Sequence, residues 1–132
     1  MKNYAVIVAG GSGHRFGSAL PKQFLPMCGK PVLMHTLERF ASAVECELVL
    51  VLPQAHQSTW RELCSRYGFT LAHRVVDGGA TRHASVSNAL NAISAVDADA
   101  VVAIHDGVRP LVSSSLIAKA FDVSRNLFIS CF

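Results

Sequence analysis

Short runs of apolar residues alternate along this chain with longer stretches whose apolar residues recur at helical spacing. The runs are rich in β-branched residues and predict buried strands at residues 5–9, 47–52, 71–76 and 100–105. Strands that alternate with helices form βαβ units, in which the strands lie parallel. The pattern therefore predicts an α/β fold of the Rossmann-like type, with an open, mostly parallel sheet and helices on both faces.

Four amphipathic stretches are predicted to be helices, because their apolar residues are three or four positions apart and so share one face. Thr81 is the N-cap candidate of the third helix, and residues 113–115 are the candidates for the fourth. The residues expected to face the core are Leu33, Leu37, Phe40 and Ala41 in the first helix, Trp60, Leu63, Cys64 and Tyr67 in the second, Val86, Leu90 and Ile93 in the third, and Leu116, Ile117, Ala120 and Phe121 in the fourth.

The chain is predicted to be a single domain, residues 1–132, since no linker, charge block or low-complexity segment divides it. A domain of this length removes about two-thirds of its unfolded surface from water. Residues 125–132 are apolar and lack the polar tail that usually solvates a terminus. Two interpretations are open for them: a fifth strand, or the point at which a longer domain has been cut or read out of frame.

Composition excludes several classes of protein. The net charge is only +3 and the basic residues are scattered, so we do not expect a nucleic-acid groove. No apolar run approaches the ~20 residues of a membrane span, and the first is too short for a signal peptide. We therefore expect a cytoplasmic protein that binds neither nucleic acid nor membranes.

The four cysteines are Cys28, Cys46, Cys64 and Cys131. They form no C-x-x-C pair, and the histidines form no H-E-x-x-H motif, which excludes the usual zinc and redox motifs. We expect reduced thiols that mostly pack against the core.

The most informative segment is A-G-G-S-G-H-R, residues 9–15, directly after the first predicted strand. Its glycines expose backbone N–H groups against which phosphate oxygens can bind. No carboxylate occurs between residues 10 and 37, whereas Arg15, Lys22 and Lys30 all lie there. The loop is therefore suited to an anion.

Two common phosphate-binding motifs do not match this segment. The dinucleotide fingerprint G-x-G-x-x-G fails at Phe16, which disfavours a dinucleotide oxidoreductase. A P-loop needs Ser or Thr after Gly-Lys, but Gly29-Lys30 is followed by Pro31.

Three predicted loops, residues 10–22, 77–82 and 105–110, leave the carboxyl ends of strands. Ligands of open α/β sheets bind outside that edge, so we expect the three loops to converge on one crevice. There, Arg15 and Lys22 would stabilise the charge that shifts between phosphorus oxygens during nucleotidyl transfer. Asp106 is the candidate ligand for the Mg²⁺ that accompanies a triphosphate, although an Asx-turn before Gly107 is an equally good interpretation.

The second of these loops, residues 77–82, gives weaker evidence for nucleotide binding. Gly79 would let a base or ribose lie against the backbone, and Ser85 would offer a hydroxyl from the first turns of the next helix. The same residues are also compatible with a simple turn that binds nothing.

Four motifs occur in one order: A-G-G-S-G-H-R, P-K-Q-F, V-D-G-G-A-T-R-H-A-S-V and H-D-G-V-R-P. Together, from about residue 4 to about residue 124, they resemble the 2-C-methyl-D-erythritol 4-phosphate cytidylyltransferase family. The resemblance implies an Mg²⁺-dependent nucleotidyltransferase of isoprenoid biosynthesis, homodimeric at full length. It would transfer CMP from CTP to methylerythritol phosphate and release pyrophosphate.

The resemblance also implies a role for individual residues. Arg15 and Lys22 would be catalytic, Asp106 would hold the metal, and Arg109 would lie near the acceptor. The nucleotide would be held by Ala9, Gly10, Gly11, Gly13, Gly79 and Ser85.

Two departures from the family pattern leave alternatives open. The family often has Pro-Ala-Ala-Gly where this chain has Val8-Ala9-Gly10-Gly11, and a related branch that uses ribitol 5-phosphate also has Ala-Gly-Gly, so another polyol or sugar phosphate remains an alternative acceptor. Family members also continue well beyond residue 132, with residues that position the acceptor and an arm that builds the dimer. We therefore expect the N-terminal, nucleotide-binding part of the domain. A non-catalytic nucleotide-binding fragment is the alternative from another class.

Overall fold

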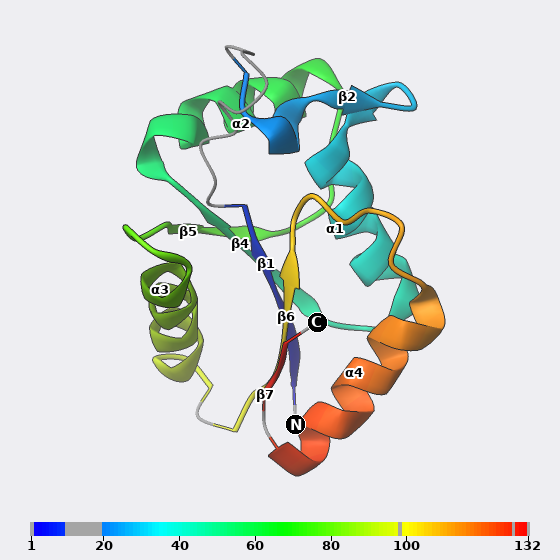
Figure 1. The fold of residues 1–132 in the computed structure, drawn as a ribbon, viewed down its shortest axis with the longest axis vertical. Coiled ribbons are helices and arrows are strands. Elements are labelled where there is room, and N and C mark those ends of the chain that lie inside the picture. The colour runs from blue at the N-terminus through cyan, green and yellow to red at the C-terminus, as the bar shows by residue number, and fades with distance from the viewer. Residues whose placement is uncertain (1, 10–19, 98, 128, 132) are drawn as a thin grey trace.

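The computed structural model describes residues 2–9, 20–97, 99–127 and 129–131, with side chains as far as residue 123 (Figure 1). In chain order the elements are β1 (Asn3–Val8), the 3-10 helix η2 (Lys22–Phe24), β2 (Pro26–Met27), β3 (Lys30–Pro31), α1 (Val32–Ala43), β4 (Glu47–Leu52), α2 (Gln54–Arg66), β5 (Arg74–Asp77), α3 (Arg82–Ser94), β6 (Val101–Asp106), α4 (Ser114–Leu127) and β7 (Ile129–Cys131).

Five of the strands form one sheet in the order β5-β4-β1-β6-β7, and every neighbouring pair is parallel. The short β2 and β3 pair separately as an antiparallel hairpin. This confirms the predicted α/β class and parallel sheet. Strand β1 lies in the middle, where Val8 is level with Val51 of β4 and with Asp106 of β6. The carboxyl ends of these three strands therefore meet at one edge.

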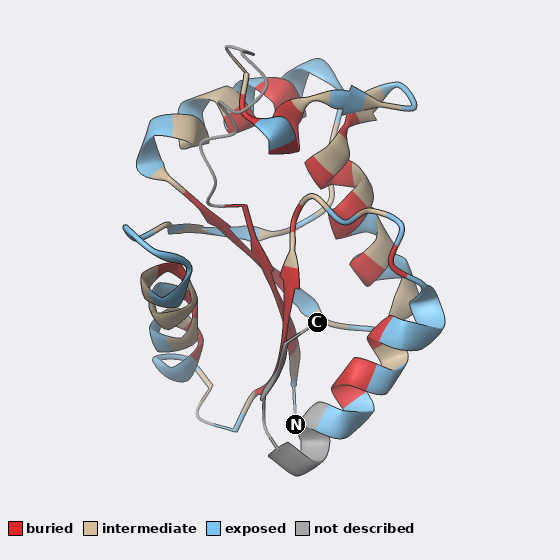
Figure 2. Ribbon diagram, viewed as in Figure 1, coloured by how far each residue is buried: buried red, intermediate tan, exposed pale blue. Residues whose placement is uncertain are grey.

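The central strands are buried on both faces, and their alternate residues contribute to two separate cores (Figure 2). Ala5 and Ile7 pack with residues of α1, α2 and α4, whereas Tyr4, Val6 and Val8 pack with α3. Helices thus cover both faces, as predicted; in Figure 1, α1 and α4 lie on one side of the sheet and α3 on the other.

The β6–α4–β7 crossover has the opposite hand to β1–α1–β4. Helices α1 and α4 cover the same face, yet β4 and β7 extend the sheet in opposite directions from β1 and β6. Crossovers between parallel strands almost all share one hand, so this is an unusual feature of the fold. Residues 129–131 form the fifth strand that was one of the two interpretations of the chain end.

Most of the predicted core positions are buried; Cys64, Val86 and Leu90 are half-buried, and three positions are exposed. Ala41 is exposed on the outer side of α1, and Leu116 is 47% exposed in the first turn of α4. Tyr67 is 41% exposed because α2 ends at Arg66, so its ring leaves the helical face. The third predicted strand is shorter than expected, since β5 begins at Arg74 and is an edge strand with mostly exposed residues.

The described cysteines are free thiols in different surroundings. Cys46 and Cys64 pack against the core, as expected, and burial raises the pKa of the Cys46 thiol to about 11. Cys28 is exposed in the β2–β3 turn and is the exception among the described cysteines, which were expected mostly to pack. Among the helices of the described residues, we find none with the length and apolar character needed to cross a membrane.

Candidate functional site

The candidate site lies at the carboxyl edge of the sheet, where β1, β4, β5 and β6 end. Four of the residues predicted for it, Gly10, Gly11, Gly13 and Arg15, lie outside the described residues. The others are Ala9, Lys22, Gly79, Ser85, Asp106 and Arg109. Ala9, Gly79, Asp106 and Arg109 lie at or within three residues of a strand end, whereas Lys22 begins η2 and Ser85 lies in α3.

Lys22 is held beside the end of β1 by its neighbour in the sequence. The Gln23 side chain is buried, and its Nε2 donates to the Ala9 carbonyl oxygen at 3.1 Å. Phe24 is buried as well and stacks on Trp60 of α2, with the ring centroids 5.9 Å apart. These two buried side chains anchor η2. Lys22, the first residue of η2, is exposed.

The β6–α4 loop is packed directly against the end of β1. The Gly107 N–H donates to the Val8 carbonyl oxygen at 2.9 Å. A Cβ on Gly107 would lie 2.9 Å from Leu33 Cδ1 and 3.3 Å from Ala9 Cβ, so this close approach favours glycine, and a larger residue would require the Leu33 side chain to move. The third predicted loop therefore meets the end of β1, the strand that precedes the first predicted loop, while residues 10–19 of that first loop lie outside the described residues.

Asp106 takes part in the turn that it begins. Its Oδ1 accepts from the Val108 N–H at 3.0 Å, which is the Asx-turn that the sequence left as an alternative. Its Oδ2 lies 3.9 Å from Arg109 Nε, and the two side chains are 36% and 73% exposed. The carboxylate is thus oriented by its own loop, while part of it still faces solvent.

The structure brings Gly79 and Ser85 together. The Gly79 N–H donates to Ser85 Oγ at 3.0 Å, and Ser85 is buried. A Cβ on Gly79 would lie only 2.5 Å from Ala84 Cβ, so packing against α3 already explains this glycine. Thr81 is the N-cap of α3, as predicted, because its side chain accepts from the Ala84 N–H at 3.0 Å.

Asp77, which ends β5, links three elements. Its Oδ2 accepts from Gln54 Nε2 at 3.1 Å and its Oδ1 from Gln57 Nε2 at 2.7 Å, both on α2. The Asn88 side chain of α3 donates to its carbonyl oxygen at 3.0 Å. Both carboxylate oxygens are therefore engaged by amide groups, and we interpret Asp77 as a structural clamp.

Asp77 and Asp106 mark two separate parts of the edge, because the strands that they end, β5 and β6, are not neighbours in the sheet. Strands β5 and β6 are three positions apart in the sheet, a separation of about 14 Å at the usual strand spacing. Within the part of the chain that the structure describes, the second loop is therefore separated along the edge from the end of β6, and a ligand that reached both Asp77 and Asp106 would have to be elongated.

Sequence reasoning missed most of the buried polar residues. Among the described residues these are Gln23, Thr36, Ser85 and His105, and only Ser85 was predicted to belong to the site. Each one makes a hydrogen bond to the main chain at the carboxyl edge. These residues could have been identified in the sequence as polar residues on an otherwise apolar face, as Thr36 is among the core residues of α1.

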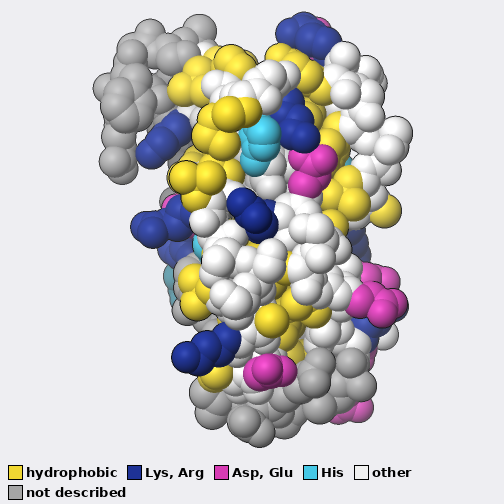
Figure 3. All heavy atoms as spheres, turned by 90° about the vertical axis from the view of Figure 1, so that its right-hand side faces the viewer, with side chains coloured by type: hydrophobic (Ala, Val, Ile, Leu, Met, Phe, Trp, Pro, Cys, Tyr) yellow, Lys and Arg dark blue, Asp and Glu magenta, His cyan; other side chains and the backbone are white. Residues whose placement is uncertain are grey.

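A groove of about 960 Å³ lies beside this edge, on the outer face of α1. It is lined by the β2–β3 turn, residues 67–71 and the outward residues of α1, and it meets the β6–α4 loop region only at Pro110 and Leu111. Figure 3 shows hydrophobic, basic and acidic side chains interspersed on this side of the molecule. Within the described parts of the chain, no cluster of three or more His, Cys, Asp or Glu residues could hold a metal by itself.

Comparisons with known proteins agree on one family. The family profile for 2-C-methyl-D-erythritol 4-phosphate cytidylyltransferase matches residues 3–128. A protein of that name from Porphyromonas gingivalis is 55% identical over 123 residues, which cover 93% of this chain and 54% of the relative. One from Bacteroides fragilis is 54% identical over 118 residues, 89% of this chain and 52% of the relative. The chain thus spans about half the length of the curated relatives it matches.

Solved structures support the same fold. The 4-diphosphocytidyl-2C-methyl-D-erythritol synthase of Anaerococcus prevotii superposes with a TM-score of 0.69 at 27% identity, over 94% of this chain and 51% of that one. A Mycobacterium tuberculosis protein, Rv0371C, solved as a complex with manganese, superposes with a TM-score of 0.68 over 96% of this chain and 61% of that one. At 22% identity the second likeness shows the fold alone.

Proposed function

Because the chain belongs to the 2-C-methyl-D-erythritol 4-phosphate cytidylyltransferase family, we propose that it carries the nucleotide half of a cytidylyltransferase site. It binds CTP at the carboxyl edge of the sheet and, within a full-length domain, donates CMP to methylerythritol phosphate. The observation that carries this proposal is the tether from Gln23 to the Ala9 carbonyl oxygen. That bond holds Lys22, a cation with a predicted catalytic role, near Ala9, the residue that precedes the glycines of the first predicted loop.

The proposed reaction is a single displacement at phosphorus. A phosphate oxygen of the acceptor attacks the α-phosphorus of CTP, a new P–O bond forms, and the bond to the β-phosphate oxygen breaks to release pyrophosphate. Negative charge accumulates on the transferred group and on the leaving group. The Lys22 ammonium and the Arg15 guanidinium stabilise that charge, and backbone N–H groups of the loop donate hydrogen bonds to the phosphate oxygens. No covalent enzyme intermediate is required.

Asp106 is the residue that fits a divalent metal in this site. Mg²⁺ in nucleotide sites takes one or two carboxylates and completes its shell with phosphate oxygens and water. Asp106 offers one partly exposed carboxylate, whereas both oxygens of Asp77 accept from glutamine amides. When bound, the metal neutralises charge on the phosphates of the nucleotide. Mg²⁺ is our proposal for this chain.

The acceptor half of the site is a separate proposal. Arg109 is the described residue assigned to the acceptor, and its side chain is largely exposed at the edge. Since the chain spans about half the length of its relatives, we expect CTP binding by this chain with little or no turnover. Ribitol 5-phosphate or another polyol phosphate is the alternative acceptor. The homodimer and the cytoplasmic location are likewise proposals, the first from the family and the second from composition.

Calorimetric titration of the chain with CTP in the presence of Mg²⁺ tests the nucleotide half. We expect saturable binding of CTP, weaker binding of UTP, GTP and dTTP, and a loss of about tenfold or more in affinity for Lys22→Ala, as for a lost charge-assisted contact. Lys119→Ala, which removes an exposed cation from α4, is the matched control and should bind normally. Absence of heat with CTP at millimolar excess would refute the proposal.

Pyrophosphate release tests the chemistry. The chain and a version extended to family length are compared with CTP and methylerythritol phosphate, then with CTP and ribitol 5-phosphate. Turnover only in the extended version supports the proposal that this chain carries the nucleotide half of the site. The preferred acceptor shows whether the protein belongs with the enzymes that use methylerythritol phosphate or with those that use ribitol 5-phosphate. CTP binding without turnover in either version would favour a non-catalytic nucleotide-binding module.

A further inference from the structure

Thr36 is fully buried on α1 and makes a contact that its helix does not need. Its Oγ1 donates to the Gly107 carbonyl oxygen at 2.7 Å, across 71 positions of the sequence. A threonine inside a helix can satisfy its hydroxyl locally, by donating to the carbonyl four residues earlier. In this structure that local contact, to Val32, is long at 3.5 Å, so the strong hydrogen bond is the one to the β6–α4 loop.

The residues on either side of Thr36 contact the same loop. Leu33, one turn earlier on α1, packs closely against Gly107, since a Cβ on that glycine would lie only 2.9 Å from Leu33 Cδ1. Phe40, one turn later, packs against the ring of His105, with the centroids 5.1 Å apart. His105 in turn donates from Nε2 to the Arg109 carbonyl oxygen at 3.1 Å. One face of α1 therefore supports the start of the loop directly, through Leu33 and Thr36, and packs through Phe40 against His105 near the end of the preceding strand.

The position of the Gly107 peptide determines where the neighbouring functional groups point. The Gly107 N–H is bonded to Val8 and its carbonyl oxygen to Thr36, so both sides of this residue are held. Asp106 immediately precedes it, and Arg109 closes the same turn by donating its N–H to the Asp106 carbonyl oxygen at 3.2 Å. A displacement of Gly107 would move both side chains relative to the end of β1.

We propose that Thr36 is a positioning residue of the nucleotide site, whose hydroxyl holds the β6–α4 loop so that Asp106 and Arg109 face the ligand. The identity of the ligand in this inference rests on the proposed function. The contact between Thr36 and the loop is observed in the structure and does not depend on that function. A valine would fill the same volume at this position. It would leave the buried Gly107 carbonyl oxygen without its donor. A buried acceptor left unpaired costs more free energy than the removal of both partners of a hydrogen bond.

The test compares Thr36→Val, which keeps the shape and removes the hydroxyl, with Thr36→Ser, which keeps the hydroxyl. In Thr36→Val we expect amide hydrogen exchange at Gly107, Val108 and Arg109 to accelerate about tenfold, as for the loss of one buried hydrogen bond. We expect the affinity for CTP with Mg²⁺ to fall by a similar factor. Thr36→Ser should restore both to within about threefold. Thr70→Val, at an exposed threonine, is the matched control.

The outcomes separate the inference from the proposed function. If the unmodified chain does not bind CTP, the proposed function fails, and with it the nucleotide role of Thr36. If the unmodified chain binds CTP and Thr36→Val has the same affinity, only the inference is overturned. If Thr36→Val does not fold, NMR of the unmodified chain decides. A slowly exchanging Thr36 hydroxyl proton and CTP-induced shifts at Thr36 and Gly107 support the role, and absence of either overturns it.

Discussion

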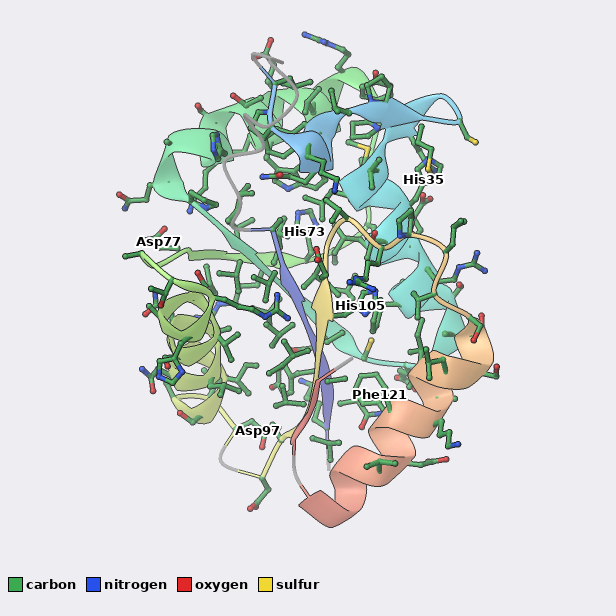
Figure 4. All side chains as sticks on the ribbon, viewed as in Figure 1. His35, His73, Asp77, Asp97, His105 and Phe121 are labelled. Carbon is green, nitrogen blue, oxygen red and sulfur yellow. The ribbon has the colours of Figure 1, made fainter. Side chains whose placement is uncertain are left out.

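The two loops that flank the candidate site are held in different ways. From Gly79 onward, the β5–α3 loop is held by contacts close in the sequence: Thr81 caps α3, and Gly79 bonds to Ser85 six residues later. Its start is held at the end of β4, where the Gly78 N–H donates to the Leu52 carbonyl oxygen at 3.1 Å. The β6–α4 loop is held instead by α1, through Thr36 and the packing of Leu33. Figure 4 shows that the two loops lie on different sides of the central strand, near the labelled Asp77 and His105.

This difference determines which substitutions should affect each loop. Local contacts form as soon as the adjoining helix forms, so damage to them should remain in the first turns of α3. Long-range contacts depend on the docking of α1 onto the sheet, so damage to them should spread between elements far apart in the sequence. Substitutions at the glycines, the cap and the two strand-end aspartates test this comparison.

The largest effect on stability is expected for Gly79→Ala. The new Cβ would lie 2.5 Å from Ala84 Cβ and 3.0 Å from the Ala84 carbonyl carbon, and a backbone atom cannot move aside. We expect a loss of about 2–3 kcal/mol in the free energy of unfolding, at the upper end of overpacking costs. Urea unfolding followed by the fluorescence of Trp60, the single tryptophan of the chain, measures it. In the double variant with Ala84→Gly, part of the loss should be recovered; full additivity would contradict a local clash.

A smaller loss is expected for Gly107→Ala. Here the nearest atom, at 2.9 Å, is Leu33 Cδ1, the end of a flexible side chain that can rotate. We expect about 1 kcal/mol by the same unfolding measurement, together with faster amide exchange at the adjoining end of β1. A loss larger than that of Gly79→Ala would show that the contact with α1 is less adaptable than its geometry indicates.

Removal of the cap in Thr81→Ala should cost about 1 kcal/mol, since the Ala84 N–H loses its acceptor. Thr81→Ser keeps an acceptor and should retain most of the stability. Amide exchange should accelerate only in the first turn of α3. If exchange also accelerated in the β6–α4 loop, the two loops would be coupled and the proposed distinction would be incorrect.

The same distinction explains how much could be predicted from the sequence. Periodicity predicts the parallel sheet and the helices, and cap chemistry predicts Thr81, because both depend on neighbours in the chain. Thr36 and Gln23 could not be assigned, since their partners lie 71 and 14 positions away and are known only once the sheet order is known. For Asp106, spacing left an Asx-turn and a metal ligand equally open; the structure shows the turn, and the metal remains a prediction.

The smallest effect on stability is expected for Asp106→Asn, although its effect on binding should be large. The Asn Oδ1 can still accept from the Val108 N–H, and the Arg109 contact is long and exposed, so the free energy of unfolding should change by no more than about 0.5 kcal/mol. The loss of negative charge removes the proposed metal ligand, and affinity for CTP should become insensitive to Mg²⁺.

Asp77→Asn is the matched control, because it makes the same change at the end of another strand of the sheet. The Gln54 and Gln57 amides can reorient to pair with the new side chain, so stability should again change little. The Mg²⁺ dependence of CTP binding should be retained, because this carboxylate is engaged by α2. If Asp77→Asn abolished that dependence and Asp106→Asn did not, the metal would belong to the β5–α3 loop. The assignment of Asp106 would then be wrong, even if the turn that it forms were correct in every contact.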